Sequence, residues 1–154
     1  MEFMISAIEA ILENIHDAEE YLIEEDIAKF IEIITTADNI FVTGAGRSGL
    51  AAKAFAMRLM HLGLSSYVVG ETISQAINAG DCILAISGSG ETNTIVTAAK
   101  ISKKRGAKVL ALTSYPESSL GQIADGIIHV KVEQKWKWMM KTTSKDKLKE
   151  ITLH

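Results

Sequence analysis

The feature that most constrains the fold of this chain is a series of short apolar runs that alternate with helical patterns. Strands are expected at 39–43, 66–69, 82–86, 108–112 and 126–130. Helices are expected at 50–62, 93–104 and 118–124, with a short helix or loop over 71–80. Such alternation is typical of a parallel sheet that is covered on both faces. The chain is therefore predicted to be a three-layer α/β domain whose five parallel strands follow the doubly wound order 2-1-3-4-5.

Two amphipathic helices are predicted ahead of the first strand. Met4, Ile8, Ile11, Leu12 and Ile15 recur at helical spacing and form one apolar stripe. A second helix is expected over 27–36, with Asp26 as its N-cap. These helices either cover an edge of the sheet or pair with another subunit.

The loop after the third strand has the residues of an anion site. Residues 87–92 read Ser-Gly-Ser-Gly-Glu-Thr, between the apolar run 82–86 and a helical pattern that starts near Asn93. The first turn of a helix has unpaired N–H groups and a partial positive charge. Glycines let this backbone approach a ligand, and hydroxyls add donors. The loop is therefore predicted to hold a phosphate group.

A second glycine-rich loop, Gly-Ala-Gly-Arg-Ser-Gly at 44–49, follows the first strand. In the order 2-1-3-4-5 the first and third strands are neighbours, and the ligand crevice lies between them. The G-x-G-x-x-G spacing also fits a dinucleotide site, with Glu71 as the acid that binds a ribose hydroxyl. A dinucleotide enzyme does not need the second loop at 87–92, so we favour a sugar phosphate over a nicotinamide cofactor.

Composition excludes several classes of partner. The 154 residues have a net charge of −3, so no overall attraction to nucleic acid or an anionic membrane is expected. No basic leader or membrane-length apolar run is visible. Cys82 is the only cysteine, which excludes an internal disulfide and favours the cytoplasm. No His, Cys and carboxylate cluster has ligand spacing, so neither a metal nor another cofactor is expected.

Besides loop 87–92, four stretches of the chain carry a recognisable pattern, at 44–50, 55–63, 69–71 and 116–119. Loop 87–92 resembles the phosphate loop of the sugar isomerase (SIS) domain family, and the other four stretches resemble the 6-phospho-3-hexuloisomerases within it. The resemblance covers about residues 5–132 and implies a phosphosugar-binding domain over 1–132, with an atypical Lys-rich tail over 133–154. The hexuloisomerases that the chain resembles interconvert a 3-ketohexose 6-phosphate and fructose 6-phosphate through an enediol. They serve formaldehyde fixation in the ribulose monophosphate pathway or pentose phosphate supply, and they are typically homotetramers.

The resemblance also implies roles for individual residues. The residues expected at the phosphate are Gly46, Arg47, Ser48, Ser87, Gly88, Ser89 and Thr92. His61 and Glu71 are the candidates for catalytic groups. For His61 the alternatives are a core or interface histidine and a group that reaches a substrate, including a neighbouring subunit's. For Glu71 they are site lining and simple solvation.

One part of the family pattern is missing from this chain. In the family, the general base is thought to be a glutamate in a Pro-x-Gly-Ser/Thr-x-Phe-Glu stretch after the fifth strand. The residues after Val132 contain no such stretch, and the only proline is Pro116. Three explanations are open. The tail is a truncated or altered end on an otherwise ordinary isomerase, or the base comes from Glu133, Glu150 or another subunit. The third is a protein that binds sugar phosphate without converting it, as a sensor does.

Overall fold

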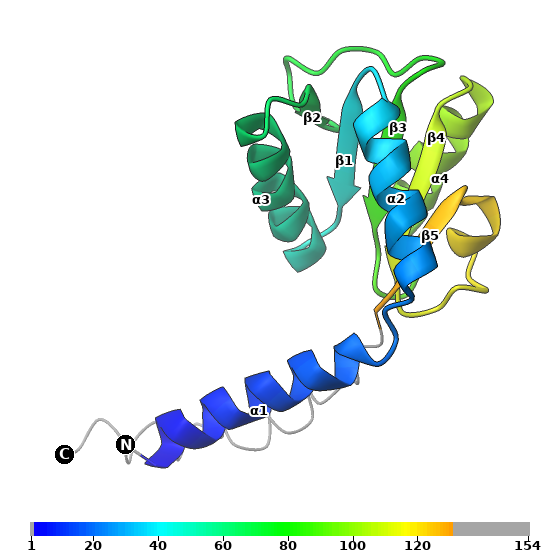
Figure 1. The fold of residues 1–154 in the computed structure, drawn as a ribbon. Helices are drawn as coiled ribbons and strands as arrows, with labels where there is room; N and C mark the ends of the chain where they lie inside the picture. Colours follow the sequence, from blue (N-terminus) through cyan, green and yellow to red (C-terminus); the bar gives the residue numbers. More distant parts are fainter. Residues whose placement is uncertain (1, 131–154) are drawn as a thin grey trace.

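The structure is a computed structural model that describes residues 2–130. It contains one sheet of five parallel strands in the order β2-β1-β3-β4-β5 (Figure 1). The strands are β1 (Ile40–Gly44), β2 (Ser66–Val68), β3 (Cys82–Ile86), β4 (Lys108–Thr113) and β5 (Gly126–His129). The predicted class and strand order are confirmed. The predicted domain boundary at residue 132 and the tail 133–154 lie outside the described residues.

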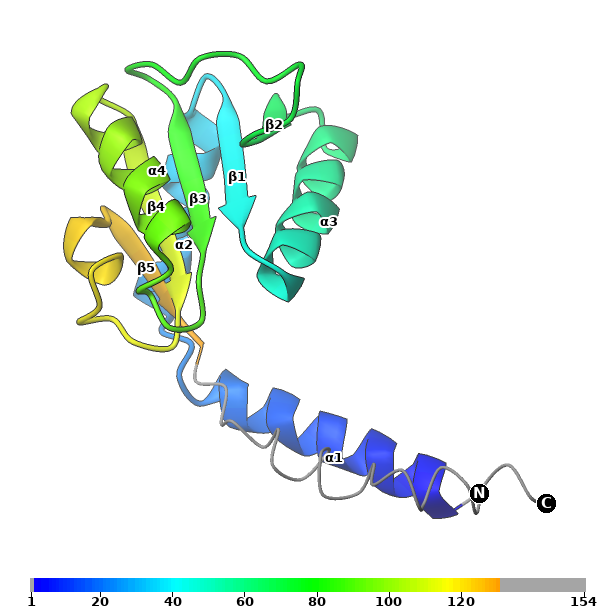
Figure 2. The same ribbon diagram turned by 180° about the vertical axis from the view of Figure 1, so that it is seen from behind.

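The helices lie on both faces of the sheet. Helices α2 (Glu24–Thr36) and α3 (Arg47–His61) cover one face, and α4 (Asn93–Lys104) covers the other together with the short 3₁₀ helix η1 (Gly121–Ile123) (Figures 1 and 2). Each face has its own apolar cluster. Under α2 and α3 it includes Phe30, Ile34, Val42, Ala56, Leu59 and Leu84. Under α4 it includes Phe41, Ile83, Ile95, Ala99, Val109 and Leu120.

Cys82 opens β3 and lies in the first of these clusters, fully buried. Burial raises the pKa of its thiol to about 12, and the nearby Asp81 carboxylate adds to the rise. The thiol is therefore protonated near neutral pH, and it packs as a small apolar side chain.

Helix α1 (Glu2–Glu19) stands apart from the sheet. It leaves the domain beyond the carboxyl ends of the strands and is not packed against the other described helices (Figure 1). Large apolar side chains along it are between 51% and 67% exposed; they are Met4, Ile5, Ile8, Ile11, Leu12 and Ile15. No helix within residues 2–130 is long and apolar enough to cross a membrane.

The ends of several elements differ from the sequence prediction. Helix α2 begins at Glu24 rather than residue 27, with Ile23 at the N-cap position, so the assignment of Asp26 as the cap is wrong. Acidic side chains stabilise the first turn of a helix, which explains why the helix extends over them. The helix expected at 118–124 is shortened to η1, whereas residues 71–80 form a loop, one of the two predicted alternatives.

Truncating a core side chain of β3 tests this packing. Leu84→Ala should lower the free energy of unfolding by about 2–5 kcal/mol, because it leaves a cavity between the sheet and the two helices above it. Leu84 is 2% exposed, whereas Leu50 on α3 is 69% exposed. Leu50→Ala is the matched control and should change stability by less than about 0.5 kcal/mol. Urea denaturation measures both; equal losses would contradict the described core.

Candidate functional site

The loop that follows β3 passes from a buried strand to an exposed turn and then to a helix. Ser87 is 3% exposed, while Gly88 and Ser89 are exposed. Thr92 is the N-cap residue of α4. The predicted strand, hydroxyl-rich loop and helix are therefore present in the predicted order.

The hydroxyls of this loop have different partners. The Ser87 and Thr92 hydroxyls are hydrogen-bonded to each other at 3.0 Å, and Ser87 Oγ also accepts from the backbone N–H of Gly90 at 3.1 Å. Ser89 Oγ accepts from the N–H of Glu91 at 3.2 Å. The buried Ser87 hydroxyl thus stabilises the turn, and the exposed hydroxyl of the loop is that of Ser89.

The backbone at the start of α4 has free donors. Thr92 forms no side-chain capping bond, and among residues 2–130 no acceptor pairs with the N–H groups of Thr92, Asn93 or Thr94. Unpaired amides at a helix N-terminus bind an anion through direct hydrogen bonds and through the helix dipole. The first turn of α4 therefore has the donors that the sequence predicted for a phosphate group.

The loop after β1 lies beside the loop after β3. Gly44 and Ile86, the last residues of the two strands, are partners in the parallel ladder. Gly46 is the N-cap residue of α3 with φ of 56°, a conformation that glycine adopts without strain. Arg47 and Ser48 are the first two residues of α3. The structure thus brings the starts of α3 and α4 to the same edge of the sheet.

A third segment, the turn after β4, holds the loop after β3 in place. The N–H of Ser114 donates to the Gly88 carbonyl at 3.1 Å, and the N–H of Leu120 donates to the Gly90 carbonyl at 3.0 Å. The Glu91 carboxylate accepts from both the N–H and the hydroxyl of Ser119, each at 2.7 Å. Sequence reasoning named 116–119 only as part of the family resemblance, because the partners lie 28 residues apart.

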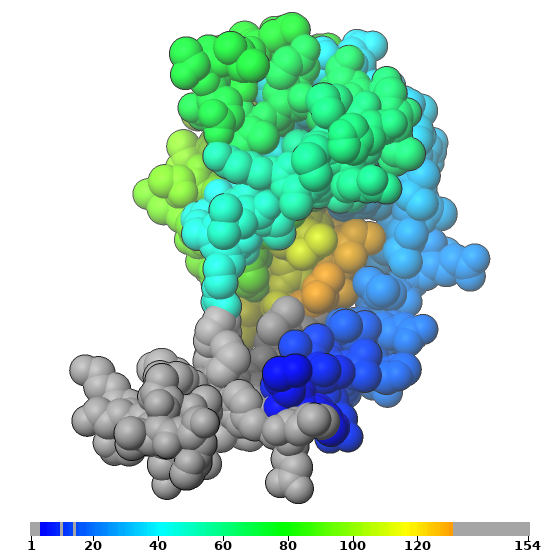
Figure 3. All heavy atoms as spheres, turned by 90° about the vertical axis from the view of Figure 1, so that its left-hand side faces the viewer, coloured from blue at the N-terminus to red at the C-terminus, as the bar shows by residue number. Residues whose placement is uncertain are grey.

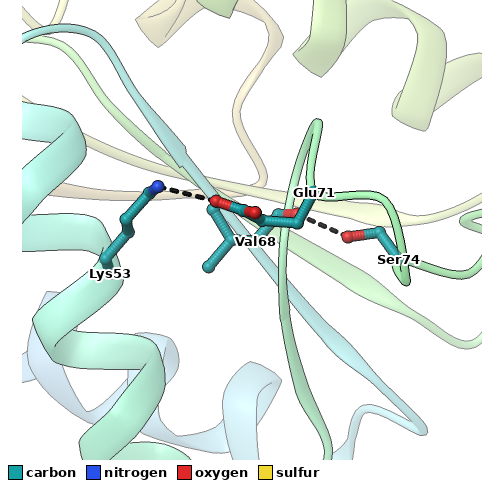
Figure 4. A network of polar contacts seen from close by, with 4 residues as sticks. All are labelled: Lys53, Val68, Glu71 and Ser74. Atoms are coloured by element: carbon teal, nitrogen blue, oxygen red, sulfur yellow. Dashed lines mark hydrogen bonds and ion pairs between the residues drawn. The ribbon is translucent and has the colours of Figure 1, made fainter.

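Glu71, one of the two catalytic candidates, is paired with a lysine. Its carboxylate lies 2.6 Å from Lys53 Nζ on α3, and Ser74 Oγ fixes the same turn by donating to the Val68 carbonyl (Figure 4). The hydrogen bond from Lys53, followed by its charge, lowers the pKa of Glu71. No hydrogen bond among residues 2–130 joins Glu71 to loop 87–92. An ionised, paired carboxylate of this kind is a weaker base than a free one.

His61, the other catalytic candidate, lies at the far end of α3 from Arg47. The helix has 15 residues, and a rise of about 1.5 Å per residue separates its ends by about 20 Å. Figure 1 shows this helix running from the carboxyl ends of the strands toward the opposite edge of the sheet, and Figure 3 looks onto it. Within one chain, His61 is therefore placed away from loop 87–92. It remains a candidate only for the site of another subunit.

These features define a class of protein: a doubly wound α/β domain in which two neighbouring strands, β1 and β3, each end in a glycine-containing loop that leads into a helix. The chain belongs to the SIS domain family, whose model matches residues 33–144. The dinucleotide alternative depended on Glu71 as a ribose ligand, and that carboxylate is engaged by Lys53 instead.

The chain aligns with only part of the length of its relatives. An uncharacterized protein of Archaeoglobus fulgidus is 46% identical over 86% of this chain and 72% of its own length. The Bacillus subtilis protein named 3-hexulose-6-phosphate isomerase is 42% identical over 78% of this chain and 65% of its own length. The alignment spans 57% of an uncharacterized Aeropyrum pernix protein that is 45% identical.

A solved structure supports the same fold. A hypothetical protein from Methanococcus jannaschii, whose structure was taken to infer the function of a 3-hexulose-6-phosphate isomerase, superimposes with a TM-score of 0.75. It is 34% identical, and the match covers 83% of this chain and 74% of the other.

Two glycines of the loop provide a matched pair of variants. Gly90 has φ of +66°, and a Cβ there would collide with the Ser118 hydroxyl. Gly90→Ala should therefore destabilise the protein, by about 1–3 kcal/mol for the backbone conformation alone. A Cβ at Gly88 would meet no atom within 4 Å, so Gly88→Ala should stay within about 1 kcal/mol of wild type. Similar stabilities of the two variants in urea denaturation would contradict this loop geometry.

Proposed function

We propose that this protein is a sugar-phosphate isomerase that interconverts D-arabino-hex-3-ulose 6-phosphate and D-fructose 6-phosphate. The observation that carries the proposal is the loop after β3, with its exposed Ser89 hydroxyl and the unpaired first-turn amides of α4. The names of the Bacillus subtilis and Mycobacterium gastri relatives, 42% and 44% identical, support this choice of substrate. The phosphosugar-binding domain is proposed to span residues 1–132, with 133–154 as a distinct tail.

The phosphate is proposed to be held by backbone and hydroxyl donors. From the loop after β3, the hydroxyls of Ser89 and Thr92 donate to the phosphate, and the Ser87–Thr92 hydrogen bond breaks to free the Thr92 hydroxyl. The backbone of Gly88 approaches the phosphate closely because glycine carries no side chain. From the second loop, Gly46 and Ser48 contact the anion and Arg47 supplies a positive charge. A dianion suits this set because hydrogen bonds to a charged acceptor are stronger than neutral ones.

The reaction itself needs a proton carrier. A base removes the proton from C2 of the 3-ketose, and the electrons of that C–H bond form the C2=C3 enediol as the C3 carbonyl takes up a proton. The C2 hydroxyl then loses its proton as the carbonyl reforms at C2, and C3 is protonated. Of the described carboxylates discussed above, Glu71 is paired with Lys53 and Glu91 with Ser119. We therefore assign the base to Glu133 or Glu150, which lie outside the described residues, or to His61 of another subunit.

A protein that binds the sugar phosphate without converting it is the second candidate. The pairing of Glu71 with Lys53 and of Glu91 with Ser119 favours this candidate. A phosphate site without an available base binds its ligand but does not convert it. This candidate shares the binding step with the first and differs only in proton transfer. The two are separated by measurement of exchange rather than of affinity.

The apolar side of α1 supports assembly into a homo-oligomer, and the family resemblance suggests a tetramer. The exposed side chains Met4, Ile8, Ile11 and Ile15 follow the spacing of a helix-bundle seam, and Leu12 widens it. Acidic residues such as Glu9 and Glu13 lie between these positions, on other faces of the helix. A second copy of α1 would cover this surface without bringing these acids into the seam.

Removing two hydroxyls tests the phosphate site. Ser89→Ala combined with Thr92→Val should weaken binding of fructose 6-phosphate by more than about tenfold, because each hydrogen bond to a charged group contributes about 1.5–3 kcal/mol. Isothermal titration calorimetry measures the affinity. Thr97→Val, on an exposed position of α4 beyond the first turn, is the matched control and should bind as wild type does. Unchanged affinity in the double variant would reject the site.

Exchange of solvent deuterium tests the reaction. In D₂O the isomerase should replace the hydrogen at C3 of fructose 6-phosphate, because the enediol is reprotonated from the solvent-exchanged base. Loss of the C3 proton signal in the NMR spectrum is the readout. The Ser89→Ala, Thr92→Val variant should exchange far more slowly. Tight binding with no exchange would establish the non-catalytic candidate instead.

Assembly through α1 predicts a change of mass on mutation. Wild type should be larger than its monomer mass of 16.7 kDa in light scattering, because the exposed stripe is buried between copies. Ile8→Lys with Ile15→Lys should reduce the mass of the assembly, because association would bury two lysine charges in the interface between copies. Glu9→Lys, on the polar side of α1, is the control. A monomeric wild type would contradict the proposal.

A further inference from the structure

Glu91 places a negative charge in a loop that is proposed to bind a phosphate. It is an acidic residue directly before Thr92, the N-cap of α4. A carboxylate at this position repels a bound dianion and competes with it for the positive end of the helix. Its presence therefore requires a separate explanation.

The Glu91 side chain is directed away from the loop and toward the turn after β4. Both its oxygens are used by one residue, because Ser119 donates from its backbone N–H and from its hydroxyl, each at 2.7 Å. These two bonds, backbone first, lower the pKa of Glu91, and the charge of Lys100 adds to them. At neutral pH the carboxylate is therefore ionised and already engaged.

The contact to Ser119 completes a row of attachments. The carbonyls of Gly88 and Gly90 accept from the N–H groups of Ser114 and Leu120, and Glu91 is the next residue along the loop. Of these attachments, the Glu91 pair is the only one made by a side chain of the loop. It is also the one nearest the free amides of α4. If it were lost, the loop would remain attached at Gly88 and Gly90 but not at the residue that precedes the N-cap of α4.

We propose that the bidentate contact from Glu91 to Ser119 presets loop 87–92 for binding of a phosphate group, so that Glu91 is a positioning residue and not a ligand. The contact holds the loop in the geometry that points the Thr92, Asn93 and Thr94 amides outward. It also turns the carboxylate away from the anion. When the loop is already ordered, binding does not lose the conformational entropy of ordering it, so the affinity is higher. The inference rests on the proposed function.

A double-mutant cycle with inorganic phosphate and fructose 6-phosphate as probes tests the inference. Glu91→Gln and Ser119→Ala should each weaken binding about tenfold, because each loses a hydrogen bond to the carboxylate. The double variant should bind no more weakly than the weaker single variant, because both substitutions remove the same contact. Ser119→Thr keeps the N–H and the hydroxyl and should bind within about twofold of wild type.

Two further variants separate charge from geometry. Glu91→Asp keeps the charge but shortens the side chain, so it should weaken binding as Glu91→Gln does. Glu117→Gln removes an exposed charge from the same turn and should leave the affinity unchanged. Amide hydrogen exchange provides a readout without ligand: the Ser119 N–H, which donates to Glu91, should exchange faster in Glu91→Gln, while the Leu120 N–H and core amides such as that of Leu84 keep their protection.

The outcomes divide between the two proposals. If wild type binds neither probe, the proposed function fails and this inference fails with it. If wild type binds and Ser89→Ala with Thr92→Val weakens binding, but Glu91→Gln binds equally well or more tightly, the site stands and the positioning role is overturned. Weakening by Glu91→Gln alone, with Ser119→Ala unchanged, would also overturn it, because Glu91 would then act without its partner.

Discussion

The parallel pairing of β1 with β3 is the interaction on which the rest of this structure depends. Residues 40–44 pair in register with residues 82–86, so the two strands end at the same level. The glycine-rich loop of one and the hydroxyl-rich loop of the other then begin side by side, although more than 40 residues separate them in the chain. A sheet without this neighbour relation would leave the two loops as unrelated turns at different places on the domain.

The candidate site relies on oriented dipoles rather than on net charge. The chain carries a net charge of −3, and Arg47 is the one cation within residues 44–49 and 87–92. Backbone amides are fixed in direction by the helix that follows them, so they select an anion without the flexible cations that would bind many anions equally. The same reliance on direction fits the attachment of the loop to the turn after β4 at Gly88, Gly90 and Glu91.

Binding and chemistry are separable in this chain. The donors proposed for a phosphate lie within the described residues, and the sheet holds them in place. Neither catalytic candidate joins them within one chain, since Glu71 is paired with Lys53 and His61 ends a helix whose start is at the loops. Under the proposed function, the base therefore comes from outside the sheet, either from the chain beyond β5 or from another copy.

Local patterns in the sequence were sufficient to predict the α/β class, the five strands and the loop at 87–92, while the strand order came from analogy with doubly wound folds. These patterns are apolar runs of strand length, glycine turns and hydroxyls before a helix. They were less accurate at the start of α2 and at η1, where end effects compete with helical periodicity. The folded chain was needed to establish that Ser87 is buried while Ser89 is exposed, and that Glu91 is held by Ser119. It was also needed to place Glu71 against Lys53 and His61 far from the loop. Such relations join residues from different strands and helices, and no local pattern encodes a contact whose partners are brought together only when the sheet forms.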